Sequence, residues 1–211
     1  MQPSYAGTFE AHITTKADDL ASLEKFNSLC EALKVKCVSI ELPQGVTCSQ
    51  PMTASYHHGS LKNVLQEVNA IAQKLANRNF EVNRIKIEAM VNNRDVPVSD
   101  IEAQRLPKSN YFEFHVKVIL SADKNLEVLR RYCLQHDAHL SRNTFKRLVD
   151  GQQERFITMR IYGVGYRSAQ KHFDNLLRLL KSKGFQLSQQ QREYTVYDSN
   201  LSLDAGWMQV S

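Results

Sequence analysis

The sequence predicts an α+β protein formed by tandem duplication of a ferredoxin-like unit with the element order β-α-β-β-α-β. Segments with an apolar residue at every second position alternate with segments of helical apolar spacing, and this order occurs twice along the 211 residues. Matching residues also recur at a nearly constant interval, since Leu126 follows Leu23 by 103 residues and Glu193 follows Glu88 by 105. A duplicated chain explains both observations.

The length of the chain fits two units of about 100 residues each. We place the first unit at 1–92 and the second, with a C-terminal tail, at 111–211. Between them, residues 93–110 carry Pro97 and Pro107 among polar residues and are expected to form a linker.

The first unit has a signal for each of its six elements. Asp19 precedes the first helical segment and is a favourable N-cap. Gly45 marks a turn after the second strand, and Asn79 is suited to the left-handed conformation that ends a helix. The expected strands cover 9–15, 35–42, 50–57 and 81–91, and the expected helices cover 20–33 and 61–75.

The second unit repeats these signals. The dipeptide Asp150-Gly151 is a hairpin turn signal, and Gly184 follows the last helical segment as a C-terminal stop. The expected strands cover 112–120, 139–149, 155–162 and 186–197, and the expected helices cover 126–133 and 169–180.

The composition describes an ordinary globular protein, with 42% hydrophobic and 9% aromatic residues. No apolar stretch reaches the about 18 residues that suggest a membrane span, so no membrane partner is expected. The four cysteines have no Cys-x-x-Cys spacing, which fits a reduced, cytoplasmic protein. The net charge of +5 is compatible with a small anionic or phosphorylated ligand, whereas no basic run indicates nucleic acid as a partner.

The strand at 111–117 has two unlike faces. Phe112 and Phe114 point one way, whereas Glu113, His115 and Lys117 point the other way, because side chains alternate along a strand. The first unit repeats this pattern in the row Glu10, His12 and Thr14. Helices cover one face of each ferredoxin-like sheet, so we expect the two polar faces to line a groove between the units.

This groove suggests binding of a phosphorylated small molecule or nucleotide, with phosphoester hydrolysis as the reaction that a histidine pair would perform. An imidazole titrates near pH 6.5, so two of them can serve as general base and general acid. The expected catalytic residues are His12, His115, Thr14 and Lys117. The expected substrate-binding residues are Glu10, His57, Lys86, Glu113, Arg142 and Arg160.

The segment Ala11-His12-Ile13-Thr14 resembles the His-x-Thr motif of the two-histidine phosphoesterases. That family hydrolyses cyclic or 2′,5′-linked phosphoesters with two such motifs in a duplicated fold. The second copy here, His115-Val116-Lys117, departs from the motif by carrying lysine where threonine or serine is expected. The resemblance implies phosphoester hydrolysis without a cofactor.

An alternative interpretation is a metal-dependent enzyme that holds one divalent transition metal ion. Its ligands would be His12, Glu88, His115 and Glu193, since imidazole and carboxylate suit such metals. This set is similar to the pairing in vicinal-oxygen-chelate enzymes, where each module contributes ligands to one ion.

A further alternative is a non-catalytic ligand-binding or interaction module. The segment Glu113-Phe114-His115-Val116-Lys117 bears on this choice, because it resembles the Glu-x-Glu-x-Lys strand of triphosphate-tunnel enzymes. In this resemblance His115 stands where that family carries a metal-binding acid.

Overall fold

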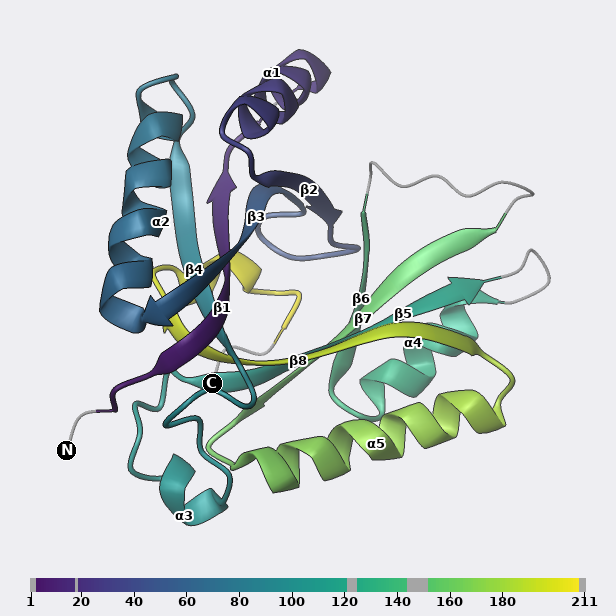
Figure 1. Cartoon of the computed structure of the whole chain (residues 1–211). Coiled ribbons are helices and arrows are strands. Elements are labelled where there is room, and N and C mark those ends of the chain that lie inside the picture. Colours follow the sequence, from purple (N-terminus) through teal and green to yellow (C-terminus); the bar gives the residue numbers. More distant parts are fainter. Residues whose placement is uncertain (1–2, 18, 121–124, 144–151, 209–211) are drawn as a thin grey trace.

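A computed structural model describes residues 3–17, 19–120, 125–143 and 152–208. Within these ranges eight antiparallel strands and five α-helices form an α+β fold, which confirms the predicted fold class at this level. The strands close into a barrel in the order β1-β3-β2-β6-β7-β5-β8-β4 (Figure 1). Among the described residues, no helix has both the length and the apolar character needed to cross a lipid bilayer.

The first half has the predicted element order. Asp19 caps the first helix by accepting a hydrogen bond from the Ser22 backbone N–H, and Ser60 caps the second in the same way. The elements are β1 (Ala6–Thr15), α1 (Leu20–Ala32), β2 (Lys36–Glu41), β3 (Ser49–Ser60), α2 (Leu61–Ala76) and β4 (Val82–Met90).

The second half repeats the order after a short additional helix in the expected linker. That helix begins with a capping box between Ser99 and Glu102. The predicted strand at 139–149 is described up to Asn143, and its turn at Asp150-Gly151 lies outside the described residues. The elements are α3 (Asp100–Ala103), β5 (Tyr111–Leu120), α4 (Leu126–Leu134), β6 (Ala138–Asn143), β7 (Gln153–Tyr162), α5 (Tyr166–Ser182), β8 (Gln186–Asp198) and the 3-10 helix Leu201–Asp204.

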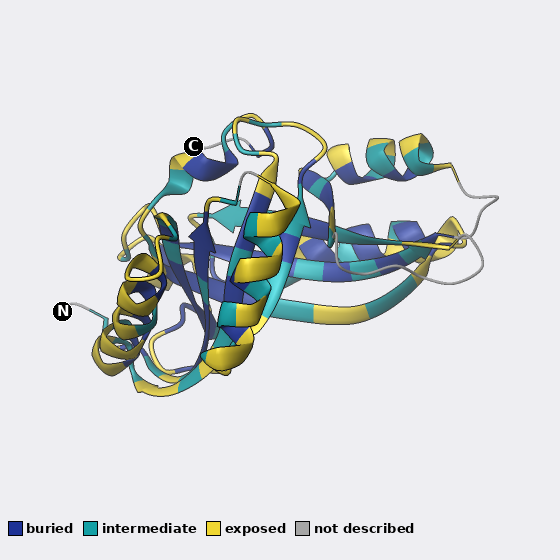
Figure 2. Cartoon of the chain, turned by 90° about the horizontal axis from the view of Figure 1, so that it is seen from above, coloured by how far each residue is buried: buried dark blue, intermediate teal, exposed yellow. Residues whose placement is uncertain are grey.

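The apolar core lies between the helices and the outer face of the barrel. Phe9 and Ile13 of β1 are buried in one cluster with Val64 and Val68 of α2. Figure 2 shows the same division, with buried strands and with helices that are exposed on their outer sides. Full burial of a large apolar side chain stabilises a fold by about 1.5–3 kcal/mol. The core therefore forces the opposite, polar face of each strand toward the barrel interior.

The two halves share one sheet, which corrects the expectation of separate sheets with a groove between them. Strand β4 pairs with β8 over five residue pairs, and β2 pairs with β6 over a shorter stretch. This pairing satisfies backbone N–H and C=O groups that a free edge strand would leave open. The predicted polar groove is therefore the interior of a closed barrel.

The C-terminal segment packs against this barrel. The Trp207 indole N–H donates to the Leu140 carbonyl at 3.1 Å. Trp207 and Met208 form a small apolar cluster with Leu42, away from the main core. These contacts bring the 3-10 helix Leu201–Asp204 close to the strands of both halves.

The N-terminal ends of α3 and α5 lie against each other at Gly165, the residue that precedes α5. The Gly165 N–H donates to Asp100 Oδ1 at 2.8 Å. A Cβ atom at Gly165 would lie 2.3 Å from the carbonyl carbon of Ser99. The position therefore requires glycine because of the close approach of another backbone segment.

We predict that Gly165→Ala lowers the free energy of unfolding by about 1–3 kcal/mol, because the added methyl group clashes with a backbone that cannot yield locally. Urea denaturation measures this change. The control is Gly163→Asn, since Gly163 has a φ of +68° and open space around it, and asparagine tolerates that conformation. Equal stability of the alanine variant and the parent protein would contradict the close approach.

Candidate metal centre

The strand register brings the polar rows of both halves into the barrel interior. In β1, Glu10 lies opposite Glu88 of β4. In β5, Glu113 lies opposite Arg160 of β7 on one side and opposite Glu193 of β8 on the other. Because paired residues share a sheet face, these side chains all point inward. The expectation that both polar rows face a common space is met for these residues.

Lys86 links the two halves inside the barrel. Its Nζ lies 2.6 Å from Glu113 Oε1 and 3.0 Å from Glu88 Oε2. On the other side of Glu113, Arg160 donates from Nε to Oε2 at 2.7 Å and from Nη2 to Asp204 Oδ2 at 2.9 Å. Both cations are therefore neutralised by buried carboxylates.

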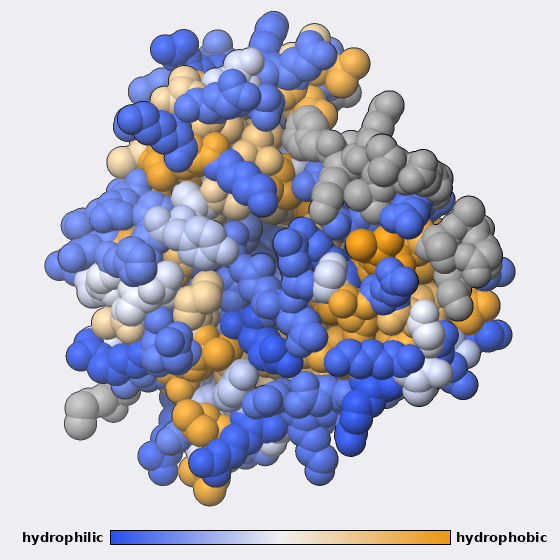
Figure 3. Space-filling model, turned by 45° about the vertical axis from the view of Figure 1, so that its right-hand side comes forward, coloured by the Kyte–Doolittle hydropathy of each residue, from blue (hydrophilic) through white to orange (hydrophobic). Residues whose placement is uncertain are grey.

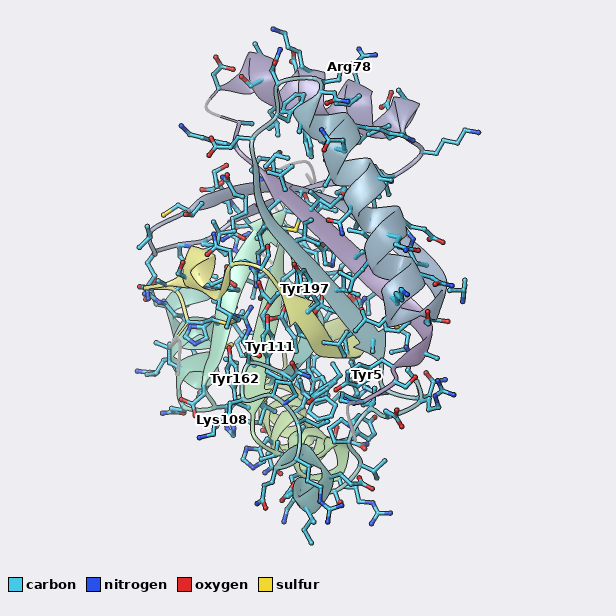
Figure 4. The ribbon with its side chains drawn as sticks, turned by 90° about the vertical axis from the view of Figure 1, so that its left-hand side faces the viewer. Tyr5, Arg78, Lys108, Tyr111, Tyr162 and Tyr197 are labelled. Atoms are coloured by element: carbon cyan, nitrogen blue, oxygen red, sulfur yellow. The ribbon has the colours of Figure 1, made fainter. Side chains whose placement is uncertain are left out.

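Arg84, two residues before Lys86 on the inner face of β4, is also neutralised by carboxylates. It donates to Asp198 Oδ1 at 2.9 Å and to Asp204 Oδ2 at 2.9 Å. The Tyr111 hydroxyl donates to Asp198 Oδ2 at 2.9 Å. The ring of Tyr111 packs against that of Tyr162 with centroids 4.9 Å apart, and the two lie side by side in Figure 4. This layer has a partner for each charge.

Carboxylates outnumber cations among these buried groups. Here the name "inner cluster" means these nine charged residues. Its cations are Arg84, Lys86 and Arg160, and its carboxylates are those of Glu10, Glu88, Glu113, Glu193, Asp198 and Asp204. If every carboxylate is ionised, the inner cluster has three negative charges in surplus. Such charges are costly in a buried position unless a proton or another cation compensates them.

Three residues of this interior have the geometry of a metal-ligand set. Candidate ligand atoms of Glu88, His115 and Glu193 all lie within 4.8 Å of one another. Glu193 Oε1 is buried without a hydrogen-bond partner among the described residues. The same holds for Glu88 Oε2, whose contact with Lys86 lacks hydrogen-bond geometry. Two buried acceptor oxygens therefore lack a hydrogen-bond donor among the described residues, and a cation held between these three residues would be a partner for both.

His12 points its Nε2 at Glu88 and at Glu10. Its Nδ1 lies 3.2 Å from the Thr53 carbonyl, which can only accept, so Nδ1 carries the proton in this contact. Its Nε2 then lies 3.4 Å from Glu88 Oε2 and 3.8 Å from Glu10 Oε1. In a neutral ring this nitrogen is an acceptor that faces acceptors. The arrangement is favourable when a proton or a metal ion lies between them.

The glutamates differ in protonation because their neighbours differ. Burial, followed by the charges of Glu88 and Glu10, raises the pKa of Glu193 well above its usual range. Burial acts most strongly on Glu88 and in the same direction, but Lys86 and His12 together outweigh it and lower the pKa of Glu88 to about 2. For Glu113, Arg160 and Lys86 together overcome burial and hold the pKa well below its usual range. Of these three glutamates, Glu193 is therefore the one without an ion pair to a lysine or arginine among the described residues.

Other polar groups hold the edges of this site. The Tyr56 hydroxyl donates to Glu10 Oε2 at 3.0 Å, and burial together with the Glu10 charge raises the pKa of Tyr56 to about 12. The Gln191 amide also donates to Glu10, and the Thr195 hydroxyl donates to Glu88 Oε1 at 3.2 Å. These contacts orient the two acids from β1 and β4.

Four predicted site residues lie apart from this centre. His57 faces outward and contacts Glu67 of α2, with Nδ1 and Oε2 2.7 Å apart, so the prediction that it shares the inner face was wrong. Arg142 lies on the exposed surface and pairs with Glu41 at 2.7 Å, so its expected place in the groove was also wrong.

Lys117 and Thr14 share the inner face but lie away from the metal-ligand set. Lys117 Nζ lies 3.9 Å from Glu154 and over the ring of Phe156. Thr14 is opposite Arg84 in the register. Neither contact places the side chain beside a histidine.

The sequence pattern placed Arg84 on the polar face and suggested a cap for Asp198, but Arg84, Asp198, Asp204 and Tyr111 were not among the predicted site residues. The signal for Asp198 and Asp204 was their position in an acidic segment at the end of the last strand. Asp204 enters the barrel interior because the C-terminal segment folds back over the barrel. No local sequence pattern predicts that path.

Comparisons with known proteins add little to this picture. No family model matches the sequence, and no curated protein matches it either. A solved chlorite dismutase variant from Candidatus Nitrospira defluvii is 14% identical, with 91% of this chain and 92% of that chain covered and a TM-score of 0.30. A protein of unknown function from Galdieria sulphuraria is 14% identical, with 89% and 98% covered and a TM-score of 0.27. Likeness at this level carries no argument about function.

We predict that Lys86→Met lowers the free energy of unfolding by about 3–5 kcal/mol, because it leaves the carboxylate of Glu88 buried without its cation and leaves Glu113 with Arg160 alone. Chemical denaturation at neutral pH measures the loss. Lys62→Met on the exposed face of α2 is the matched control and should change stability by no more than about 0.5 kcal/mol.

The double variant Lys86→Met/Glu88→Gln provides a second test of the same contact. It should recover part of the loss, since the glutamine no longer carries the stranded charge. Strictly additive effects of the two changes would show that Lys86 and Glu88 do not interact.

Proposed function

We propose that the protein is a metal-dependent enzyme that binds one divalent transition metal ion inside its barrel through Glu88, His115 and Glu193. The observation that carries this proposal is the close grouping of their ligand atoms, within 4.8 Å, together with the two buried acceptor oxygens that lack hydrogen-bond partners among the described residues. The doubly charged ion would also offset most of the negative surplus of the inner cluster.

The ligand types narrow the choice of metal. One imidazole and two carboxylates suit Zn²⁺, Mn²⁺, Fe²⁺ or Ni²⁺. Three protein ligands are typical of catalytic sites, which keep positions open for water and substrate. His12 lies next to Glu88 and can serve as a further ligand or as a base.

Solvent reaches this region of the barrel. The side chains of His12 and His115 are 17% and 23% exposed. Figure 3 shows hydrophilic residues around a hollow near the centre of the face toward the viewer. Because both imidazoles keep part of their surface exposed, a small polar substrate can reach them without unfolding of the barrel.

We further propose that the substrate is a phosphorylated small molecule or nucleotide. Arg84, Lys86 and Arg160 are neutralised by carboxylates, so they supply little positive charge for a phosphate. When bound, a divalent ion supplies that charge, polarises a phosphoryl oxygen and activates a water molecule. The resemblance of the Glu113 strand to triphosphate-tunnel enzymes favours the same substrate class.

His12 is the base that this reaction would use. The Thr53 carbonyl holds the Nδ1 proton, so Nε2 is free to accept a proton from an attacking water. Glu10 lies 3.8 Å from the same nitrogen and would stabilise the imidazolium that results.

A second candidate function is metal-free phosphoester hydrolysis by His12 and His115. This candidate is favoured because both histidines lie inside the barrel, each beside a buried glutamate. In this mechanism Glu88 and Glu193 would have no role as ligands. The dependence of activity on added metal separates the two candidates.

We predict about one bound ion per chain when untagged protein is stripped with a chelator, reloaded with Mn²⁺ or Zn²⁺ and analysed for metal content. Glu193→Gln and His115→Ala should weaken binding by more than the roughly 10–100-fold typical of changes outside the ligand shell. The loaded protein should cleave a 2′,3′-cyclic nucleotide, and the stripped protein should not.

The matched controls are Glu67→Gln and His57→Ala, because these residues form a similar pair on the outside of the barrel. Both variants should retain the ion. Cleavage by stripped protein that is lost in His12→Ala would support the metal-free candidate. The absence of any bound ion in folded parent protein would refute the metal proposal.

A further inference from the structure

A row of cationic side chains follows the exposed side of α5. The row consists of Arg167, Lys171, Arg178 and Lys181, which are separated by 4, 7 and 3 positions. This spacing places all four on one side of a helix. At 1.5 Å per residue the row extends over about 21 Å. The opposite side of α5 is buried in the core through residues such as Phe173 and Leu176.

This row borders a surface hollow of about 520 Å³ between α5 and β8. The lining contains five cationic side chains and one carboxylate, a surplus of four positive charges. The whole chain has a net charge of +5, so this hollow concentrates charge far more than a uniform surface would. The lining residues are Arg167, Gln170, Lys171, Asp174, Leu177, Arg178, Lys181, Gln190 and Arg192.

Arg192 of β8 forms the side of the hollow opposite α5. Its guanidinium lies over the ring of Phe173, 5.3 Å from the centroid, and its Nη2 donates to Asp174 at 3.3 Å. Its Nε is buried and has no hydrogen-bond partner among the described residues. The single carboxylate of the hollow thus pairs with Arg192, which leaves the row on α5 without a matching acid in the lining.

We propose that this hollow is a binding surface for the phosphodiester backbone of nucleic acid. Lysine and arginine neutralise backbone phosphates, and amides such as those of Gln170 and Gln190 donate to phosphate oxygens. None of the lining residues is aromatic, so the surface has no platform on which bases can stack. Binding is therefore independent of base sequence.

The surroundings favour a nucleic acid over an anionic membrane. Helices that lie on membranes insert exposed apolar side chains. The large apolar side chains that are exposed among the described residues, such as Leu20, Ile101 and Leu134, all belong to elements other than α5. A straight charged row on a helix without exposed apolar residues fits a backbone of regularly spaced phosphates.

The equivalent helix of the first half supplies the comparison. Helix α2 carries only Lys62 and Lys74 as cations, and Glu67 lies between them. The basic row is thus a feature of α5 and does not follow from its position in the fold. It also lies on the outside of the barrel, so its occupancy is independent of the metal centre.

The test measures binding of the full chain to a fluorescent 20-nucleotide single strand and to the corresponding duplex, by anisotropy over a range of salt concentrations. Lys171→Gln/Lys181→Gln should raise Kd by at least about 10-fold and lower the slope of log K against log salt by roughly 1.4 for the single strand. The control Lys62→Gln/Lys74→Gln removes the same charge from α2 and should change Kd by less than about 2-fold.

Equal losses in the two variants would overturn the proposal, because they would reflect net charge alone. The absence of binding to either probe at low salt would also overturn it. A third result would overturn the proposal. In it, neither nucleic acid probe binds, but phosphatidylserine vesicles or inorganic tripolyphosphate bind in a way that requires Lys171 and Lys181. Circular dichroism of both variants checks that the chain remains folded.

Discussion

The buried excess of carboxylates over cations is the constraint on which this structure depends. Three cations inside the barrel face six carboxylates, and Lys86 bridges glutamates from both halves. Arg84 and Arg160 meet at Asp204, which ties the C-terminal segment to the same network. Burial makes this constraint severe, since the carboxylates of Glu88 and Glu113 have almost no contact with solvent. The network consequently holds the two halves together and also requires a compensating charge.

The compensation differs between two layers of the interior. Around Arg84 each carboxylate has a cationic or hydroxyl partner, as expected for a structural network. Around Glu193 the acids lie near one another and near imidazoles, and two of their oxygens lack hydrogen-bond partners among the described residues. Buried pairs are not in themselves strongly stabilising. Within the described chain, the carboxylates around Arg84 are all paired, whereas those around Glu193 are not. This difference favours a ligand-binding role for the group around Glu193 over a purely stabilising one.

Much of this arrangement was predictable from local pattern. The element order follows from apolar periodicity, and Glu113 and His115 alternate so regularly with phenylalanines that their inward direction is unambiguous. The β3 segment lacks such contrast, because small and polar residues occupy both of its faces. Tyr56, rather than His57, faces inward there, which only the pairing with β1 decides. Closure of the barrel, and the reach of Asp204, depend on contacts between distant segments that no periodicity encodes.

The pH dependence of stability, measured for the parent protein and Glu193→Gln in chelator, tests the unpaired carboxylate most directly. The folded state raises the pKa of Glu193, so folding takes up a proton once pH exceeds the unfolded value of about 4.3. The parent protein should therefore lose stability relative to the glutamine variant as pH rises from 5 to 8. Added Mn²⁺ or Zn²⁺ should reverse this trend in the parent protein alone, because the ion binds the ionised carboxylate. Parallel profiles for the two proteins, with and without metal, would contradict the account.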